Sequence, residues 1–111
     1  MAIKLSEKMF ENRVKAFLEG EGAWFVKTWS NGVQRKGIPD ILACVNGYFV
    51  GIETKADTGT PSELQLWNVE QIRRAGGFAF VLYPSGFHKF QEFILDLKVE
   101  RFTRDMEVEL R

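Results

Sequence analysis

The chain has 111 residues, no net charge and one cysteine. This length suits a single packed domain, and the charge balance gives no overall sign of a nucleic-acid or membrane partner. One cysteine excludes an internal disulfide and a cysteine-based zinc site. Because no apolar run approaches the roughly 20 residues of a membrane helix and no signal-peptide pattern opens the chain, we expect a cytoplasmic protein, in the host cytoplasm if a phage encodes it.

The first predicted helix covers about residues 4–19. Apolar side chains recur at helical spacing through it, from Phe10 to Leu18. Glu11 lies on this apolar stripe, where an acid needs a partner. Alternatively, Glu11 lies at the edge of the stripe and reaches water, and Glu7 on nearly the same face is a rival for any role given to Glu11.

Three strands are predicted next, at residues 24–29, 40–45 and 48–55. Asn46-Gly47 between the last two is typical of a two-residue hairpin turn. Both faces of this hairpin are largely apolar, which favours a sheet covered by helices on both sides. Cys44 lies on one of these apolar strands and is expected to be buried.

The hairpin register brings two acids together. Counting outward from the turn pairs Ile41 with Ile52 and therefore Asp40 with Glu53. Opposed like charges are destabilising, but a hard divalent cation between them would reverse that effect, because such ions prefer carboxylate oxygens. Lys55 shares the face of Glu53 because strand side chains alternate. The simpler alternative is a cross-strand salt bridge at the rim of the sheet.

The second half of the chain predicts helix, strand and helix. Thr60, Pro61 and Glu63 are typical of a helix start, with Thr60 as N-cap and Glu63 completing a capping box, and this helix runs to about residue 75. Gln65 falls on its inner stripe, as a site residue or as a core glutamine bonded to backbone. A strand at 78–83, parallel to the preceding strand, and a helix at 87–98 follow. His88 begins that helix and is expected at the surface or in a cap.

The predicted order is α-β-β-β-α-β and a terminal helix, an α/β fold with a mixed sheet in three layers. One domain covers residues 1–111, with a core at about 4–98 and a charged tail at about 99–111 that the pattern does not place. Basic side chains near the acidic pair, Lys27, Arg35 and Lys36, are either the walls of a nucleic-acid site or solvated surface charges.

This pattern resembles the PD-(D/E)xK nuclease superfamily, with its restriction-endonuclease-like core. The residues that carry the likeness are Pro39-Asp40 and Glu53-Thr54-Lys55. Within the superfamily, the chain resembles the stand-alone VRR-NUC nucleases of phages and bacteria. That narrower likeness runs from Glu11 to about residue 83 and includes the segments Gly37-Ile38-Pro39-Asp40, Gly47-Tyr48-Phe49, Glu53-Thr54-Lys55-Ala56 and Ala75-Gly76-Gly77, with Lys27, Gly59, Ser62 and Gln65.

The resemblance implies a phosphodiesterase that uses one or two Mg²⁺ or Mn²⁺ ions. Asp40 and Glu53 would be direct ligands, the Thr54 carbonyl would add an oxygen, and Glu11 would complete the metal site. Lys55 would orient the attacking water or stabilise developing charge, and Gln65 would position the phosphate or a metal-bound water. The positions expected to contact DNA are Lys27, Arg35, Lys36 and Ser62.

The expected substrate is DNA, as a Holliday junction or other branched form cut by a homodimer. Aromatic residues near the last helix, Phe87, Phe90 and Phe102, are candidates for the dimer interface or for ordinary core packing. A restriction-like, flap or nicking nuclease with the same chemistry is the alternative. A non-catalytic DNA-binding relative is disfavoured, because each expected catalytic position is filled.

Overall fold

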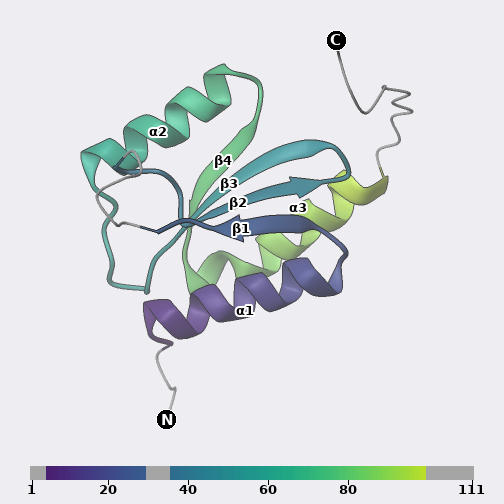
Figure 1. Cartoon of the computed structure of the whole chain (residues 1–111). Helices are drawn as coiled ribbons and strands as arrows, with labels where there is room; N and C mark the ends of the chain where they lie inside the picture. The colour runs from purple at the N-terminus through teal and green to yellow at the C-terminus, as the bar shows by residue number, and fades with distance from the viewer. Residues whose placement is uncertain (1–4, 30–35, 100–111) are drawn as a thin grey trace.

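The structure is a computed structural model and describes residues 5–29 and 36–99. Its elements in chain order are α1 (Glu7–Gly20), β1 (Trp24–Lys27), β2 (Ile41–Val45), β3 (Tyr48–Thr54), α2 (Glu63–Arg74), β4 (Phe78–Leu82), the short 3-10 helix η1 (Pro84–Gly86) and α3 (Phe87–Val99). The strands form one sheet in the order β1-β2-β3-β4, in which β1, β2 and β3 are antiparallel and β4 is parallel to β3 (Figure 1). This mixed α/β sheet with an additional C-terminal helix confirms the predicted fold class.

The hairpin between β2 and β3 turns at Asn46 and Gly47, whose φ angles are 50° and 88°. Positive φ at both centres is what a type I′ turn requires, and it explains the Asn-Gly dipeptide. The turn fixes the register, so that Val45 pairs with Tyr48 and Ile41 with Ile52, as the sequence predicts. This register determines which side chains meet at the far end of the two strands.

The core lies between the sheet and the pair of helices α1 and α3. Its buried cluster joins Phe10 and Leu18 of α1 to Ile52 of β3 and Ile94 of α3. α2 covers the opposite face over β3 and β4 (Figure 1). None of the helices within the described part of the chain is both long and apolar enough to cross a membrane.

The start of α2 differs from the prediction. Ser62, not Thr60, is the N-cap, and its Oγ accepts a hydrogen bond from the N–H of Gln65 at 3.1 Å. The Gln65 side chain accepts in return from the N–H of Ser62 at 2.8 Å. The helix begins later because the chain first turns, with the N–H of Gly59 donating to the Ala56 carbonyl at 2.9 Å.

Cys44 is exposed, so the prediction that it is buried is wrong. The cause is incomplete cover of one face: α2 packs over β3 and β4, and the same face of β1 and β2 stays open. Trp24 on that face is 68% exposed. The expectation that helices cover both sides of the whole hairpin is therefore wrong for its outer part.

The aromatic residues of α3 belong to the core. Phe90 is 3% exposed, and Phe87 packs edge-on against Phe10 and Phe17 with ring centroids 5.9 and 6.0 Å apart. Neither is free to form the dimer interface suggested by the sequence. Phe102, the third candidate, lies outside the described residues.

Candidate active site

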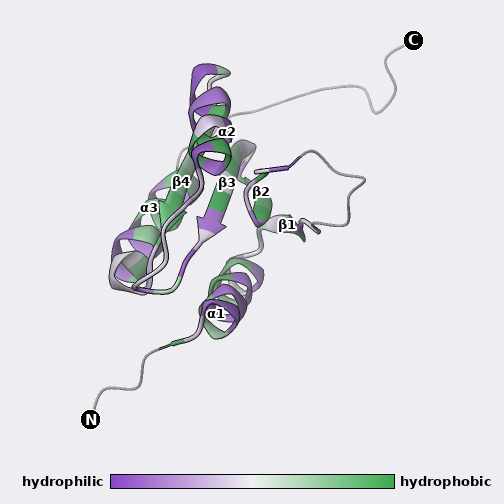
Figure 2. Ribbon diagram, turned by 90° about the vertical axis from the view of Figure 1, so that its left-hand side faces the viewer, coloured by the Kyte–Doolittle hydropathy of each residue, from purple (hydrophilic) through white to green (hydrophobic). Residues whose placement is uncertain are grey.

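The predicted catalytic residues meet where β2 begins and β3 ends. Asp40 directly precedes β2, while Glu53 and Thr54 are the last two residues of β3 and Lys55 follows. Because the two strands are antiparallel, the beginning of one lies beside the end of the other. Figure 2 shows β3 as a hydrophobic strand with a hydrophilic arrowhead at this end.

Asp40 is anchored by Thr54. Its Oδ2 accepts hydrogen bonds from the backbone N–H and from the hydroxyl of Thr54, both at 3.0 Å. The backbone of Asp40 is held as well, since its carbonyl accepts from the N–H of Thr28 at 2.8 Å, and the Thr28 hydroxyl donates to the Pro39 carbonyl at 2.9 Å. The carboxylate of Asp40 is thus oriented by a buried threonine and by the neighbouring strand.

The loop before Asp40 passes close to α2. Gly37 has a φ of 79°, and a Cβ at this position would lie 2.6 Å from the Cγ of Leu64. Asn68 is buried and donates to the carbonyls of Lys36 and Leu64 at 3.3 and 3.0 Å. These contacts bring the Gly37–Asp40 segment to the sheet, and they explain a glycine three residues before the acid.

Glu53 is 1% exposed, and neither of its carboxylate oxygens has a hydrogen-bond partner among the described residues. Burial and the adjacent Asp40 raise the pKa of Glu53 to about 9, with Lys55 acting in the opposite direction. A buried carboxylate without a partner is costly. The arrangement suits a cation ligand, because a divalent ion would satisfy both oxygens and remove the repulsion from Asp40.

The pKa of Asp40 is shifted in the opposite direction. Burial alone would raise the pKa of Asp40, but Glu53, Lys27 and Thr54 together hold it below its usual value. With the two pKa values pushed apart, the pair carries one proton at neutral pH, held by Glu53, while Asp40 is ionised. Displacing that proton would free both groups to bind a metal.

Glu11 is buried on α1, with 5% exposure, and lies among lysines. Its carboxylate oxygens lie 2.5 Å from the Nζ of Lys27, 3.2 Å from that of Lys8 and 3.5 Å from that of Lys15. Burial alone would raise the pKa of Glu11, but Lys27 and Lys8 lower it. The acid on the apolar stripe therefore has partners, and they are cationic.

Lys27 joins Glu11 to the acidic pair. Its Nζ lies 3.6 Å from Oδ1 of Asp40. Burial alone would lower the pKa of Lys27, but Glu11 and Asp40 raise it, so the ammonium stays charged. Lys27 thus lies within the acidic cluster, although the sequence suggested only a DNA contact for it.

Lys55 lies on the same side of the site, and its side chain is 16% exposed. Its Nζ is 3.8 Å from Oε1 of Glu7, the rival acid, which is half exposed. α1 therefore presents both acids to the site, Glu11 toward Lys27 and Glu7 toward Lys55. A cavity of about 180 Å³ opens here, lined by Glu7, Lys8, Glu11, Lys27 and Asp40. A larger hollow of about 440 Å³ along β4 contains none of these acids.

The remaining predicted site residues lie elsewhere or are occupied. The side chains of Gln65 and Ser62 close the capping box of α2. Lys36 is exposed, and Arg35 lies outside the described residues. His88 is at the surface beside Glu92, with Nε2 and Oε1 3.1 Å apart. The reaction roles given to Gln65 and Ser62 stay predictions.

Within residues 5–29 and 36–99, no three acidic, histidine or cysteine side chains are gathered as a ready-made metal site. The reason is visible in the geometry, since Lys27 lies between Glu11 and Asp40. The carboxyl groups that fit a metal are those of Asp40 and Glu53, and the ligand role of the Thr54 carbonyl stays a prediction. Sequence reasoning missed the Thr54 hydroxyl, Thr28 and Asn68, because tertiary contacts alone give these residues their roles.

Comparison with known proteins identifies a family and a similar solved structure. The family model described as archaeal Holliday junction resolvase (Hjc) matches residues 5–100. Among solved structures, the chain is similar to Archaeoglobus fulgidus Hjc, a Holliday junction resolvase from an archaeal hyperthermophile, with a TM-score of 0.52 and 23% identity over 68% of this chain and 66% of that one. The likeness thus spans just under two thirds of that protein. No curated protein matches the sequence.

The mixed sheet, with Asp40, Glu53 and Lys55 at one end, defines a protein of the PD-(D/E)xK nuclease superfamily. Because the family model covers most of its length, the chain belongs to the archaeal Holliday junction resolvase (Hjc) family.

Proposed function

We propose that the protein is a divalent-metal-dependent endonuclease that hydrolyses phosphodiester bonds in branched DNA, with the four-way junction as its main substrate. The observation that carries the proposal is Glu53, a buried carboxyl group beside Asp40 whose two oxygens have no hydrogen-bond partner among residues 5–29 and 36–99. Membership in the Hjc family supports the choice of substrate. The narrower likeness to stand-alone VRR-NUC nucleases, from Glu11 to about residue 83, and a phage or bacterial source are part of the same proposal.

Asp40, Glu53 and the carbonyl of Thr54 would hold one or two Mg²⁺ or Mn²⁺ ions. When bound, such an ion would neutralise charge on the phosphoryl group. It would also lower the pKa of a water molecule bound to it, so that the water becomes a better nucleophile near neutral pH. Thr54 keeps the Asp40 carboxylate oriented through two hydrogen bonds. Residues that hydrogen-bond to a metal ligand fix the geometry of that ligand and strengthen metal binding.

Lys55 is the cation that would act on the reacting phosphate. Its side chain is largely buried beside Glu53, and its Nζ is held near Glu7 without a tight ion pair, at 3.8 Å. An ammonium in this position stabilises negative charge that builds on the phosphoryl oxygens, and it can orient the attacking water. Gln65 would contact the phosphate only after leaving the capping box.

Lysines around Glu11 would guide the DNA backbone to the acids. Lys8, Lys15 and Lys27 all approach the Glu11 carboxylate, so one buried acid gathers three cations, of which Lys8 and Lys27 line the cavity. The other positions predicted from the sequence would extend these contacts along the DNA backbone: Arg35, Lys36 and Ser62. Contacts of this kind bind phosphates without reading bases, which suits selection of a DNA shape.

A junction has two equivalent cleavage points. A two-fold dimer presents two sites with matching symmetry, so we propose that the protein acts as a homodimer making paired nicks.

A panel of labelled substrates in Mn²⁺ tests the proposal: a four-way junction, a flap and a linear duplex. We expect symmetric cuts in the junction and little cleavage of the duplex. Preferred cutting of the flap would favour a flap or nicking enzyme with the same residues. Tight junction binding with no cleavage under any divalent metal would favour a non-catalytic relative.

A further inference from the structure

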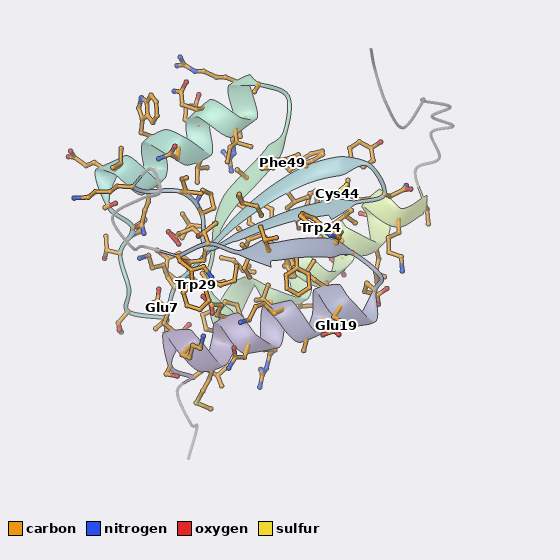
Figure 3. All side chains as sticks on the ribbon, viewed as in Figure 1. Glu7, Glu19, Trp24, Trp29, Cys44 and Phe49 are labelled. Atoms are coloured by element: carbon orange, nitrogen blue, oxygen red, sulfur yellow. The ribbon has the colours of Figure 1, made fainter. Side chains whose placement is uncertain are left out.

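The open face of β1 and β2 carries a row of exposed apolar side chains. Trp24 pairs with Cys44 across β1 and β2, and Cys44 pairs with Phe49 across β2 and β3. Directly paired residues point to the same face of a sheet. Trp24 is 68% exposed, Phe49 is 45% exposed, and Cys44 between them is exposed as well. Figure 3 shows the three in line across neighbouring strands.

The neighbouring row on the same face is also uncharged. Val26 pairs with Leu42, and Leu42 pairs with Gly51. Val26 is 39% exposed and Leu42 is half-buried. Gly51 at the end of this row is buried under α2, close to Ile72. We call the residues outside that cover the open sheet face: Trp24, Cys44, Phe49, Val26 and Leu42. A face without charge is complementary to a second copy of itself, as an isologous two-fold interface requires.

The size of the open sheet face suits the centre of a dimer interface. With about 150–250 Å² for each aromatic side chain, the exposed parts of Trp24 and Phe49 amount to on the order of 250 Å². Val26, Leu42 and Cys44 bring the apolar area to roughly 350–400 Å². A standard interface buries about 800 Å² per partner, and somewhat more than half of it is apolar. The open sheet face therefore supplies most of the apolar area that one protomer needs.

We propose that the open sheet face is the dimer interface, occupied by the same face of a second copy. This inference rests on the proposed junction cleavage, which calls for two symmetric sites. The centre of the face is set apart from those sites, because Cys44 is four residues from Asp40, or about 13 Å at 3.3 Å per residue, while Leu42 at its edge is two residues, or about 7 Å, from Asp40. Sheet-on-sheet packing at this end leaves the acidic end of each sheet open to DNA.

Cross-linking of the unmodified protein tests the location, because Cys44 is the only cysteine. Stacked sheets lie about 10 Å apart, which is too far for a direct disulfide. A bismaleimide with a spacer of about 10 Å should therefore link two copies through Cys44 in one rapid step. The matched control carries Cys44→Ser with Leu95→Cys, which moves the thiol to an exposed position on α3. We expect the wild type to link at least tenfold faster than this control.

Sedimentation of two matched variants gives a second readout. Phe49→Glu and Leu95→Glu introduce the same charge at positions that are 45% and 46% exposed. Phe49→Glu should weaken dimerisation at least ~30-fold, the effect of losing an interface hot spot, while Leu95→Glu should leave it unchanged. Circular dichroism checks that both variants are folded, and the cross-linking arm does not depend on them.

The results separate this inference from the proposed function. A Cys44-linked dimer that does not cut junctions would support the interface and remove the function. Paired junction nicks by a dimer that links no faster than its control, and that survives Phe49→Glu, would overturn the interface and keep the function. A monomer at micromolar concentration would also overturn the interface and would assign the open sheet face to another partner. A Phe49→Glu variant that stays dimeric and loses only junction binding would overturn it too and would assign this face to DNA.

Discussion

The Asp40 carboxylate accepts two hydrogen bonds from Thr54, one from the backbone N–H and one from the hydroxyl, each at 3.0 Å. Both bonds go to the same oxygen, Oδ2. Thr54 therefore orients the carboxylate of Asp40 without bonding to its other oxygen, Oδ1. Glu53, next to Thr54 in the chain, has no such partner among the described residues. One acid of the pair is thus positioned by the protein, and the other is left for a ligand.

Thr54→Val tests whether this positioning matters. The change keeps the shape of a fully buried side chain but removes one of the two bonds to Asp40. We expect a loss of about 1–3 kcal/mol in the free energy of unfolding and a loss of about 10–100-fold in metal affinity. Urea unfolding and metal titration by calorimetry measure the two effects. Unchanged metal affinity would show that the backbone N–H alone orients Asp40.

Asp40→Asn tests the metal ligand itself. Asparagine can still accept from Thr54, so the fold should persist, but the charge that attracts a cation is gone. We expect cleavage to fall at least ~100-fold, more than loss of a supporting group would cause, and EDTA to abolish the activity of the wild type. Full activity in EDTA would contradict the assignment of Asp40 and Glu53.

If Lys55 acts on the reacting phosphate, as proposed, Lys55→Ala should lower turnover far more than DNA binding. A drop of about 10²–10³-fold in the rate is the scale for losing one charge-stabilising group. Lys98→Ala is the matched control, since that lysine pairs with Glu21 at 2.7 Å and lies outside the site. If junction affinity falls in step with the rate, Lys55 is a phosphate contact instead.

The metal-free protein should lose stability as the pH rises. The pKa of Glu53 is raised from 4.5 to about 9, so between these values the folded state binds more protons than the unfolded state. Stability then falls with rising pH, by up to ~1.4 kcal/mol per unit for one group. Urea unfolding in EDTA at pH 6 and pH 8 measures the slope.

Glu53→Gln is the control for that slope. The amide does not titrate, so the variant should lose most of the decline between pH 6 and pH 8, and it should be inactive as a nuclease. An equal decline in wild type and variant would place the titrating group elsewhere. The lowered pKa values of Asp40 and Glu11 act in the acid range, where protonation of these groups removes stability as the pH falls.

The sequence predicts the catalytic end of the hairpin well because a short-range signal sets it. Asn46-Gly47 allows only a tight turn, and the turn fixes the Ile41–Ile52 pairing that places Asp40 beside the end of β3. The predicted capping box of α2, with Thr60 as N-cap and Glu63 as its partner, is wrong, because Ser62 and Gln65 form it instead. Ser62 prevails once the preceding turn at Gly59 is formed.

Burial and pairing of individual side chains were harder to predict. Cys44 is exposed because α2 covers only part of the sheet, and strand alternation does not say which part. Lys27 could be assigned to DNA from its charge, but its position between Glu11 and Asp40 depends on how α1 packs beside β1. Such contacts arise between elements distant in the chain, where no local pattern specifies them.

Cleavage of a supercoiled plasmid with an extruded cruciform is the most direct test of the central claim, metal-dependent resolution of junctions by the Asp40–Glu53 site. With Mn²⁺, the wild type should convert the plasmid to linear product through two cuts within one binding event, and Asp40→Asn should leave it supercoiled. Nicked circles alone, equal cutting of a plasmid without the cruciform, or linear product from the Asp40→Asn variant would contradict the account.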